Sequence, residues 1–405
     1  MNKGVVIIFG FLALVMGAGA IVALRDQGAS TLVAGDTKLG QPLLPQLKAA
    51  DVARITIREP EASITLEKKN QRWVINERAG FPADLDKVTE LVVKAIELKI
   101  GQAEGIGDKD RARMQLGAPG AAEGAATAVQ FAAADGKMLA ELWIGKKYFK
   151  SAPEGDAAKA QGDGRFVMLP SDTGRVVTVA DPLKQATSSA TDWIAREGVV
   201  VENIQSIEVK SAEGGYRIAR ALLDTPWELD GADVKSAKSA KSAKSAKPAV
   251  AGKAGAAAGA GATALDQSRA SSTTYALAKL DLDNVAAPGT DAGFEAGSEI
   301  IASTFDGLEY RIKVGRLVSE RYYVQVALQG EPRRSAPSAP ANEKPEDKEK
   351  REKAFAEDTM RFNQRIGREK ALAPFTLLVA KAKFADVLKK RDALLADAKK
   401  DAAKK

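Results

Sequence analysis

The chain has 405 residues, with 60 Lys and Arg against 53 Asp and Glu, and it contains neither histidine nor cysteine. Its length suits two or three domains at about 100–200 residues per domain. The missing residue types exclude a Ser-His-Asp triad, a cysteine nucleophile, an imidazole or thiolate metal site, a disulfide and a lipid-modified cysteine.

The N-terminus predicts a membrane anchor. Gly4–Leu24 is a run of 21 positions without a charge, and a helix needs roughly 20 apolar residues to cross about 30 Å of hydrocarbon. Lys3 precedes the run, and Arg25 and Asp26 follow it as a cancelling pair. The short N-terminal tail is therefore expected in the cytoplasm and the rest of the chain outside.

We accordingly predict an anchor over residues 1–25, in contact with membrane lipid, and a polar spacer over residues 26–44. Two alternatives stay open. A signal peptide cleaved near Gly17–Ala20 would leave no anchor in the mature protein, and a buried core helix would leave the chain entirely outside the membrane.

Past the spacer the chain shows an internal repeat, with a first copy predicted over residues 45–198 and a second over residues 199–397. Each copy opens with three runs in which apolar and polar residues alternate, which indicates an antiparallel meander with one buried face. The runs are Asp51–Ile57, Ser63–Glu67 and Arg72–Ile75 in the first copy, and Asn203–Val209, Tyr216–Ala219 and Pro226–Leu229 in the second. Trp73 and Trp227 occupy equivalent positions, 154 residues apart.

A helix follows the meander in each copy. Asp84 is the expected N-cap of the first helix, whose apolar face comprises Leu85, Val88, Leu91, Val92, Ala95 and Ile96. The second helix is predicted over Ser268–Leu280, with a weaker stripe of Tyr275, Leu277 and Leu280.

Each copy then returns to strands. Hairpins are predicted around the turns Asp135-Gly136 and Asp306-Gly307. A further strand, Arg165–Leu169, is matched with Pro374–Val379 in the second copy. The predicted fold class is therefore α+β: an N-terminal transmembrane helix followed by two tandem copies of a mainly antiparallel sheet-plus-helix unit.

Disordered insertions are predicted at residues 233–263 and 331–372 of the second copy, and a basic tail at residues 398–405. The first insertion contains the low-complexity tract Lys235–Lys247, in which a lysine recurs every three residues and nothing apolar is available to bury. It is interpreted as a plain surface linker, or alternatively as a polycationic tether for anionic lipid. Within the second insertion, the sparse apolar residues Phe355, Met360, Phe362 and Ile366 favour an exposed helix that could bind a partner.

The net charge of +7 does not indicate nucleic-acid binding. The Lys235–Lys247 tract contributes +5 and Lys389–Lys405 contributes +4, which leaves −2 for everything else. No aromatic residue interrupts the lysines of the tract, so the stacking part of a single-strand binding site is missing.

No catalytic, cofactor-binding or metal-binding residue is predicted, and no cofactor. Asp281 and Asp283 lie close together but lack the glycine and the distal glutamate of a calcium loop, so a turn or cap is the favoured interpretation. The glycine-rich runs lack the Gly-Lys-Ser/Thr sequence of a phosphate-binding loop. The tryptophans Trp73, Trp143, Trp193 and Trp227 are interpreted as core anchors, with a carbohydrate platform as the alternative.

Several motifs resemble those of a known family. They include a Leu-Gly-x-Pro step at Leu116–Pro119, an Ile-Gly-Lys strand end at Ile144–Lys146, aromatic strand starts at Tyr148-Phe149 and Tyr322-Tyr323, and a terminal Phe384…Leu388…Leu394-Leu395 pattern. Over residues 45–397, apart from the insertions, the chain resembles the bacterial family catalogued as domain of unknown function 4340. The resemblance implies an envelope protein anchored in the inner membrane, often beside ABC-type transporters similar to those of gliding motility. It assigns no catalytic residues.

We therefore expect a non-enzymatic, single-pass inner-membrane protein with its N-terminus in the cytoplasm and its bulk in the periplasm. It would serve as an accessory or scaffold to an ABC-type transporter complex of the envelope, with an envelope or transporter subunit as its partner. The first alternative is a periplasmic glycan- or lipid-binding module, which needs a concave apolar or Trp-lined pocket between the two copies. The second is a carboxylate-based hydrolase, which needs two carboxylates in one cleft.

Overall fold

The computed structural model describes residues 39–149, 163–230, 264–334, 336, 338–340 and 343–396. The predicted anchor, the insertion at 233–263 with its Lys-Ser-Ala tract, and the basic tail at 398–405 lie outside these residues. Among the described residues, no helix combines the length and the apolar character that crossing a membrane requires.

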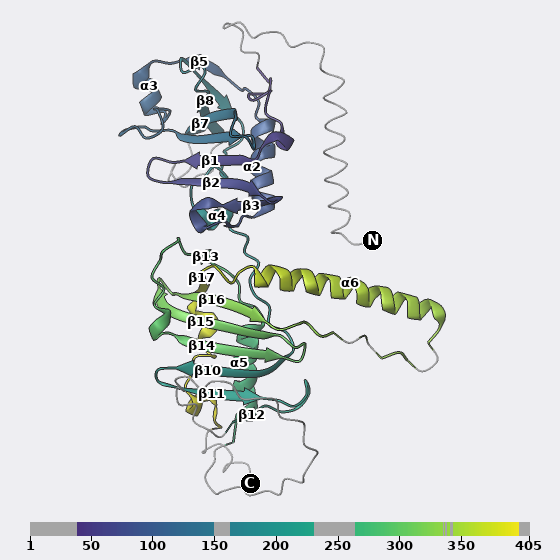
Figure 1. The fold of residues 1–405 in the computed structure, drawn as a ribbon. Helices are drawn as coiled ribbons and strands as arrows, with labels where there is room; N and C mark the ends of the chain where they lie inside the picture. The colour runs from purple at the N-terminus through teal and green to yellow at the C-terminus, as the bar shows by residue number, and fades with distance from the viewer. Residues whose placement is uncertain are drawn as a thin grey trace, which may run out of the picture.

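The described chain forms two antiparallel sheets with few helices, an α+β fold (Figure 1). The first sheet has nine strands in the order β4-β3-β2-β1-β6-β7-β8-β9-β5. They are β1 (Arg54–Arg58), β2 (Ser63–Lys69), β3 (Arg72–Ile75), β4 (Phe81–Pro82), β5 (Ala103–Gly105), β6 (Thr127–Ala132), β7 (Met138–Tyr148), β8 (Gly164–Met168) and β9 (Arg175–Val179).

The second sheet has eight strands in the order β12-β11-β10-β14-β15-β16-β17-β13. They are β10 (Ile204–Ser211), β11 (Gly214–Ala219), β12 (Glu228–Leu229), β13 (Asn284–Val285), β14 (Ser298–Thr304), β15 (Glu309–Val318), β16 (Arg321–Gln329) and β17 (Leu377–Ala380). The predicted Asp-Gly turns join β6 to β7 and β14 to β15, and Gly136 and Gly307 both adopt positive φ there.

The two sheets are connected in the same way. Apart from β4 at its edge, the first sheet runs β3-β2-β1-β6-β7-β8-β9-β5, and each strand has a counterpart at the same place in the second. These two similar sheets fit the predicted repeat. One predicted match is wrong: the counterpart of β8 is β16, whereas β17 corresponds to β9. The sequence pattern missed β9 because its Arg-Val-Val-Thr-Val run is nearly continuous in apolar residues and lacks the alternation used to find strands.

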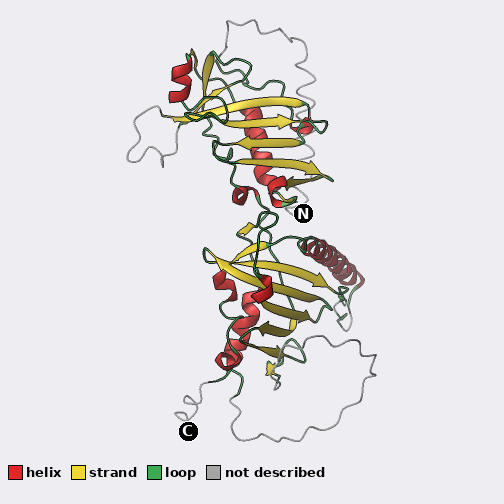
Figure 2. Cartoon of the chain, turned by 60° about the vertical axis from the view of Figure 1, so that its left-hand side comes forward, coloured by secondary structure: helices red, strands yellow, loops and turns green. Residues whose placement is uncertain are grey.

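A helix with an aspartate cap covers one face of each sheet (Figure 2). In the first, α2 (Leu85–Glu97) buries Val88, Leu91, Val92 and Ala95, and Asp84 caps it as predicted. In the second, α5 (Gln267–Ala278) buries the smaller residues Ala270, Thr273 and Leu277. The prediction that Tyr275 faces the core is wrong: it is 85% exposed, because a residue two positions before Leu277 points to the opposite side of a helix.

The remaining short helices are α3 (Asp108–Arg113), α4 (Ala190–Trp193) and the 3-10 turns Ala49–Asp51, Asn76–Arg78, Phe294–Ala296, Lys381–Phe384 and Arg391–Leu394. A single cluster of buried apolar residues runs through both sheets, and a smaller one in the first sheet consists of Leu116, Met168 and Val176.

The two sheets meet at a packed junction. Phe81 of β4 contacts Phe375 edge to face, with ring centroids 5.0 Å apart. Ile194 and Val199 of the connecting segment are fully buried, and Val199 exchanges backbone hydrogen bonds with Leu280. Only glycine fits at position 198, because a Cβ atom there would collide with the carbonyl oxygen of Leu280.

The second sheet carries one large addition, α6 (Pro345–Lys370), a helix of 26 residues between β16 and β17. At the corresponding place the first sheet has only the turn at residues 169–174 between β8 and β9. The prediction that residues 331–372 are disordered is therefore wrong for residues 345–370, which form α6. Proline at the helix start, acidic residues in the first turn and basic residues in the last all favour a helix, and Phe362 and Ile366 bury its end against the second sheet.

The two aspartates that cap α2 and α5 can be tested with the same pair of substitutions. Asp84 accepts hydrogen bonds from the backbone N–H groups of residues 86 and 87, and Asp266 accepts them from residues 268 and 269. We expect Asp84→Ala and Asp266→Ala each to lower the free energy of unfolding by about 1 kcal/mol, measured by urea denaturation. Asparagine at either position should keep most of the stability, and equal losses with Asn and Ala would contradict the capping role.

Candidate functional site: the root of helix α6

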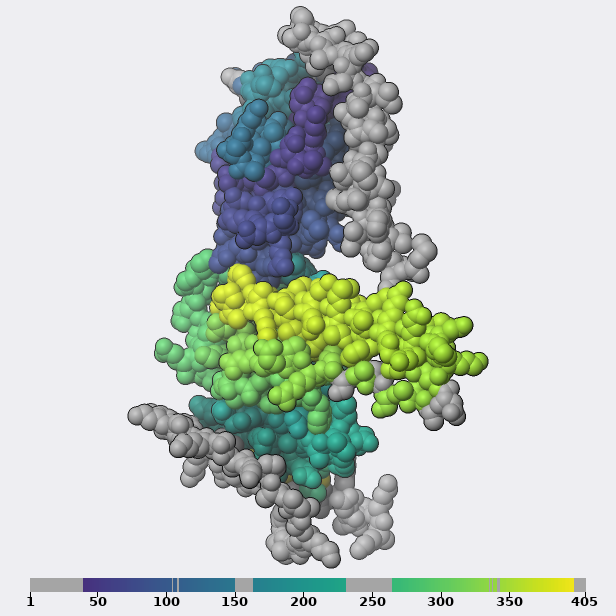
Figure 3. All heavy atoms as spheres, turned by 45° about the vertical axis from the view of Figure 1, so that its right-hand side comes forward, coloured from purple at the N-terminus to yellow at the C-terminus, as the bar shows by residue number. Residues whose placement is uncertain are grey.

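The last part of α6, residues 362–370, packs against the second sheet and the linker at residues 195–203 that joins the two sheets; we call this part the root. The rest of the helix, residues 345–361, projects sideways from the level where the sheets meet, and we call it the arm (Figures 1 and 3). At about 1.5 Å per residue the whole helix is about 39 Å long. The root is thus the place where an extended surface element joins the body of the protein.

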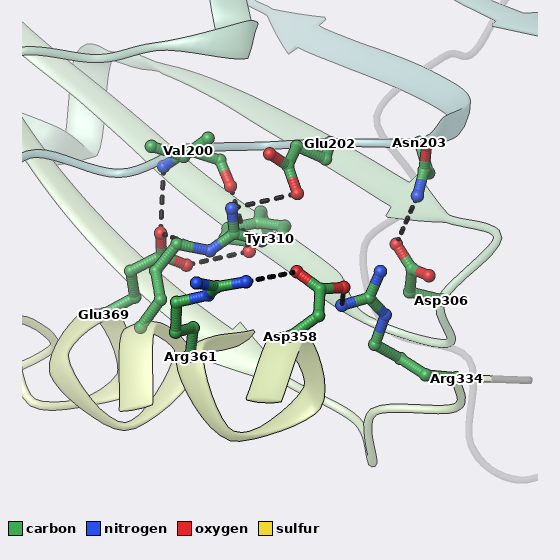
Figure 4. Close-up of polar contacts among 10 residues, drawn as sticks. Val200, Glu202, Asn203, Asp306, Tyr310, Arg334, Asp358, Arg361 and Glu369 are labelled. Carbon is green, nitrogen blue, oxygen red and sulfur yellow. Dashed lines mark hydrogen bonds and ion pairs between the residues drawn. The ribbon is translucent and has the colours of Figure 1, made fainter. Parts of the chain in front are cut away.

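A buried carboxylate lies at the centre of the root. Glu369 is 1% exposed. Its Oε1 accepts a hydrogen bond from the backbone N–H of Val200 (3.0 Å), and its Oε2 accepts one from the Tyr310 hydroxyl (2.8 Å), as Figure 4 shows. Tyr310 belongs to β15 and Val200 to the linker, so this one side chain joins α6 to both.

Burial sets the protonation of this pair. It raises the pKa of the Glu369 carboxyl above its ordinary value, against the hydrogen bonds from Val200 and Tyr310, which lower it. Burial, and next the neighbouring Glu369 carboxylate, raises the pKa of the Tyr310 hydroxyl. The tyrosine therefore keeps its proton and remains a donor to Glu369.

Arginines complete the root. Arg365 lies with its Nε 3.7 Å from a Glu369 carboxylate oxygen and forms an ion pair, through a terminal nitrogen, with Glu202 of the linker at 2.9 Å. Arg368 pairs with Glu197 at 3.0 Å, also on the linker. The side chains at positions 365, 368 and 369 share one face of the helix, and all three bind the linker.

An aromatic ring also anchors the root. Phe362 is buried, and two guanidinium groups contact its ring, with Arg334 4.8 Å and Arg365 5.0 Å from the ring centroid. Arg334 also pairs with Asp358 at 2.6 Å, and Asp358 lies 3.9 Å from Arg361 (Figure 4). Cation–π contacts with Arg are favourable even near the surface, so these contacts fix the point where the helix leaves the body.

The arm presents a different surface. Its first turns are dense in exposed Lys and Glu, with an i,i+4 pair between Lys348 and Glu352 at 3.9 Å. Further along, Phe355, Ala356, Thr359 and Met360 form an open, mainly apolar strip that the amides Asn363 and Gln364 continue toward the root, and Met360 is 56% exposed. The four apolar residues noted in the sequence are thus divided: Phe362 and Ile366 anchor the root, whereas Phe355 and Met360 belong to the arm.

The other residues noted in the sequence do not gather into one site. Asp281 pairs with Lys279 (3.1 Å) and Lys383 (3.5 Å), and Asp283 pairs with Arg321 (2.9 Å). Each carboxylate therefore has its own cationic partners. No group of three potential metal ligands is found within the described part of the chain.

The tryptophans are also separate, and their surroundings differ. Trp193 is fully buried and donates its indole N–H to the Thr187 carbonyl, and Trp227 is buried beneath the guanidinium of Arg220. Trp73 is partly buried against the main cluster, and Trp143 packs against the smaller one. Their packing follows the prediction of core anchoring.

Sequence reasoning missed Glu369 and Tyr310. One signal for the glutamate was present: the helix face that carries Phe355, Phe362 and Ile366 continues to Glu369 at i+3 from Ile366, so a charged residue falls where the stripe is buried. No local pattern indicates which distant groups would satisfy it.

The root can be tested through Glu369. We expect Glu369→Ala to lower the free energy of unfolding by about 2–4 kcal/mol. The Val200 N–H loses its acceptor, the Tyr310 hydroxyl keeps only the more distant Val200 carbonyl at 3.4 Å, and Arg365 loses one of two carboxylates. Glu369→Gln should lose less, since its amide can accept from Val200 and donate to the Tyr310 oxygen. Urea denaturation measures both, with Arg361→Ala on the exposed side of the helix as the control, expected within about 0.5 kcal/mol of wild type.

The same variants give the pH dependence. Because the folded-state pKa of Glu369 lies above its ordinary value of 4.5, folding favours the protonated carboxyl. This stabilisation is fully present below the ordinary pKa and is lost as the pH rises through the folded-state pKa. Relative to Glu369→Gln, which does not titrate, wild type should therefore lose stability as the pH rises above about 4.5. A stability difference that does not change with pH would contradict the assignment.

Comparison with known proteins adds one finding. A family model described as Domain of unknown function (DUF4340) matches residues 73–297, more than half of the 405 residues. The match runs from β3 to the residue before β14, so it is narrower than the range the motifs indicated, and α6 lies outside it. No curated protein and no solved structure matches the chain. On the strength of the family match, the chain belongs to the family described as Domain of unknown function (DUF4340).

Proposed function

We propose that this protein is a non-enzymatic scaffold or accessory subunit of an ABC-type transporter complex in the bacterial envelope. In this proposal residues 4–24 anchor it in the inner membrane as a single transmembrane helix, with the N-terminus in the cytoplasm. Two tandem copies of one α+β unit then stand in the periplasm, and the arm of α6 contacts another subunit.

The observation that carries the proposal is the arm itself. It occupies a position where the similar first sheet has a short turn, so the sheet does not need it in order to close. A projecting helix exposes to water apolar side chains that a packed helix would bury. Exposed apolar strips with charged residues around them are typical of protein contact sites. The partner expected is an envelope protein with an apolar surface for Phe355 and Met360 and charges of both signs around it.

The described surfaces give less support to the alternatives. A glycan or lipid site was expected as an apolar or Trp-lined pocket between the copies, but Phe81 and Phe375 pack against each other at that junction. The hollow on the open face of the second sheet is polar instead. It holds two carboxylates, Glu208 of β10 and Glu309 of β15. Each pairs with a cation two residues along its own strand, Glu208 with Lys210 (3.2 Å) and Glu309 with Arg311 (2.8 Å), as expected on the solvent-facing side of an antiparallel sheet.

The contact can be tested by site-specific photo-cross-linking in intact membranes. A photoreactive residue at Met360 should cross-link to a transporter or other envelope subunit. The matched control is Met138 at the start of β7, which is 48% exposed against 56% for Met360. A cross-linked product at both positions, or at neither, would contradict the assignment of the arm. Deleting residues 345–361 should abolish co-purification of the same subunit.

The topology has its own test. A reporter that works only outside the cytoplasm should be active when fused after Lys405, and one that works only in the cytoplasm should be inactive. The opposite result would overturn the proposed orientation. Mass spectrometry of the intact protein distinguishes an uncleaved anchor from a signal peptide cleaved near Gly17–Ala20.

A further inference from the structure

The root of α6 binds the only chain segment that connects the two sheets among the described residues. Arg368 pairs with Glu197, Glu369 accepts from the N–H of Val200, and Arg365 pairs with Glu202. These contacts are spread over six residues of the linker (197–202) and five of the helix (365–369). A helix held to a segment at three points constrains both the position and the direction of that segment.

The chain after the root reaches the junction from the other side. Six residues beyond Glu369 lies Phe375, whose ring contacts Phe81 of the first sheet at 5.0 Å. Between them Leu372 is buried, and the carbonyl of Ala373 accepts a hydrogen bond from Gln325 of β16 at 3.2 Å. The end of α6 is therefore coupled to the first sheet by two routes, the linker and the Phe81–Phe375 contact.

The arm extends this coupled element outward. Residues 345–361 span about 25 Å of continuous helix, and a helix transmits displacement along its length because each turn is hydrogen-bonded to the next. The residues of α6 that contact the linker lie within about 10 Å of its C-terminal end. The arm is thus long compared with the root that holds it.

We propose that α6 is a lever that sets the orientation of the first sheet relative to the second, with the arm and the inter-sheet angle moving together. Which molecule binds the arm depends on the proposed function. The coupling between the arm and the inter-sheet angle does not, because it involves only contacts within this chain. Because coupling is reciprocal, binding at the arm would bias the inter-sheet angle, and a change in that angle would change the arm.

The absence of cysteine from the sequence allows the coupling to be measured directly on the purified chain. Met138→Cys in the first sheet and Leu317→Cys in the second, both at exposed positions, provide a pair of sites for spin labels in pulsed dipolar spectroscopy. A second pair, Met138→Cys with Met360→Cys, reports on the arm. For wild type, both pairs should give a single narrow distance distribution.

The test variant is Arg365→Ala/Arg368→Ala, which removes two of the three contacts between the root and the linker and leaves Glu369 with its two donors. In this variant the distance distributions of both label pairs should broaden. Glu369→Ala, the second variant, should do the same. Arg361→Ala is the matched control, because this arginine lies on the arm side and contacts Asp358 instead of the linker, and both distributions should stay narrow.

The outcomes separate the proposals. If the Met138–Leu317 distribution is already broad in wild type, or stays narrow in both root variants while circular dichroism shows intact folding, the lever is wrong. If the root variants broaden both distance distributions but photo-cross-linking at Met360 finds no subunit, the coupling is supported and the proposed partner is wrong.

Discussion

A carboxylate removed from water must receive hydrogen-bond donors, and the organisation of this protein around α6 follows from how Glu369 meets that need. One donor is a backbone N–H of the linker and the other is the hydroxyl of a strand residue in the second sheet. An unpaired buried charge would cost several kcal/mol, so helix, linker and sheet are held together in one arrangement. The arginines and Phe362 around this carboxylate then determine where the helix leaves the body.

Comparing the two sheets separates what the fold requires from what has been added. Both are completed by the same order of strands and covered by one capped helix on the buried face. The connection that is a short turn in the first sheet holds a 26-residue helix in the second. Lengthening a surface connection costs little in loop entropy, so such an addition is tolerated without disturbing the sheet. The root of the helix nevertheless makes specific hydrogen bonds and ion pairs with the linker and β15, which a loop of added length alone would not require.

Much of the fold could be predicted because its signals are local. Alternation located the meander strands, the Asp84 cap preceded the apolar stripe of α2, and Asp-Gly pairs marked two hairpin turns where glycine adopts positive φ. The misses have physical causes of a different kind. The apolar run of β9 does not alternate, and the weak stripe of α5 placed Tyr275 on the wrong face. The charged composition of residues 345–361 suits an exposed helix as well as it suits disorder.

The sequence by itself determined which chemistry is excluded, through the missing His and Cys, and it determined the strand, turn and cap positions that depend on neighbours within a few residues. Only the tertiary structure decided the partners of Glu369, which lie 59 and 169 positions away along the chain. It also decided that Phe362 and Ile366 are buried while Met360 of the same helix is not. A residue pattern shows which groups need partners or burial. Which distant groups provide them depends on how the sheets and the linker pack in space, and no local pattern contains that information.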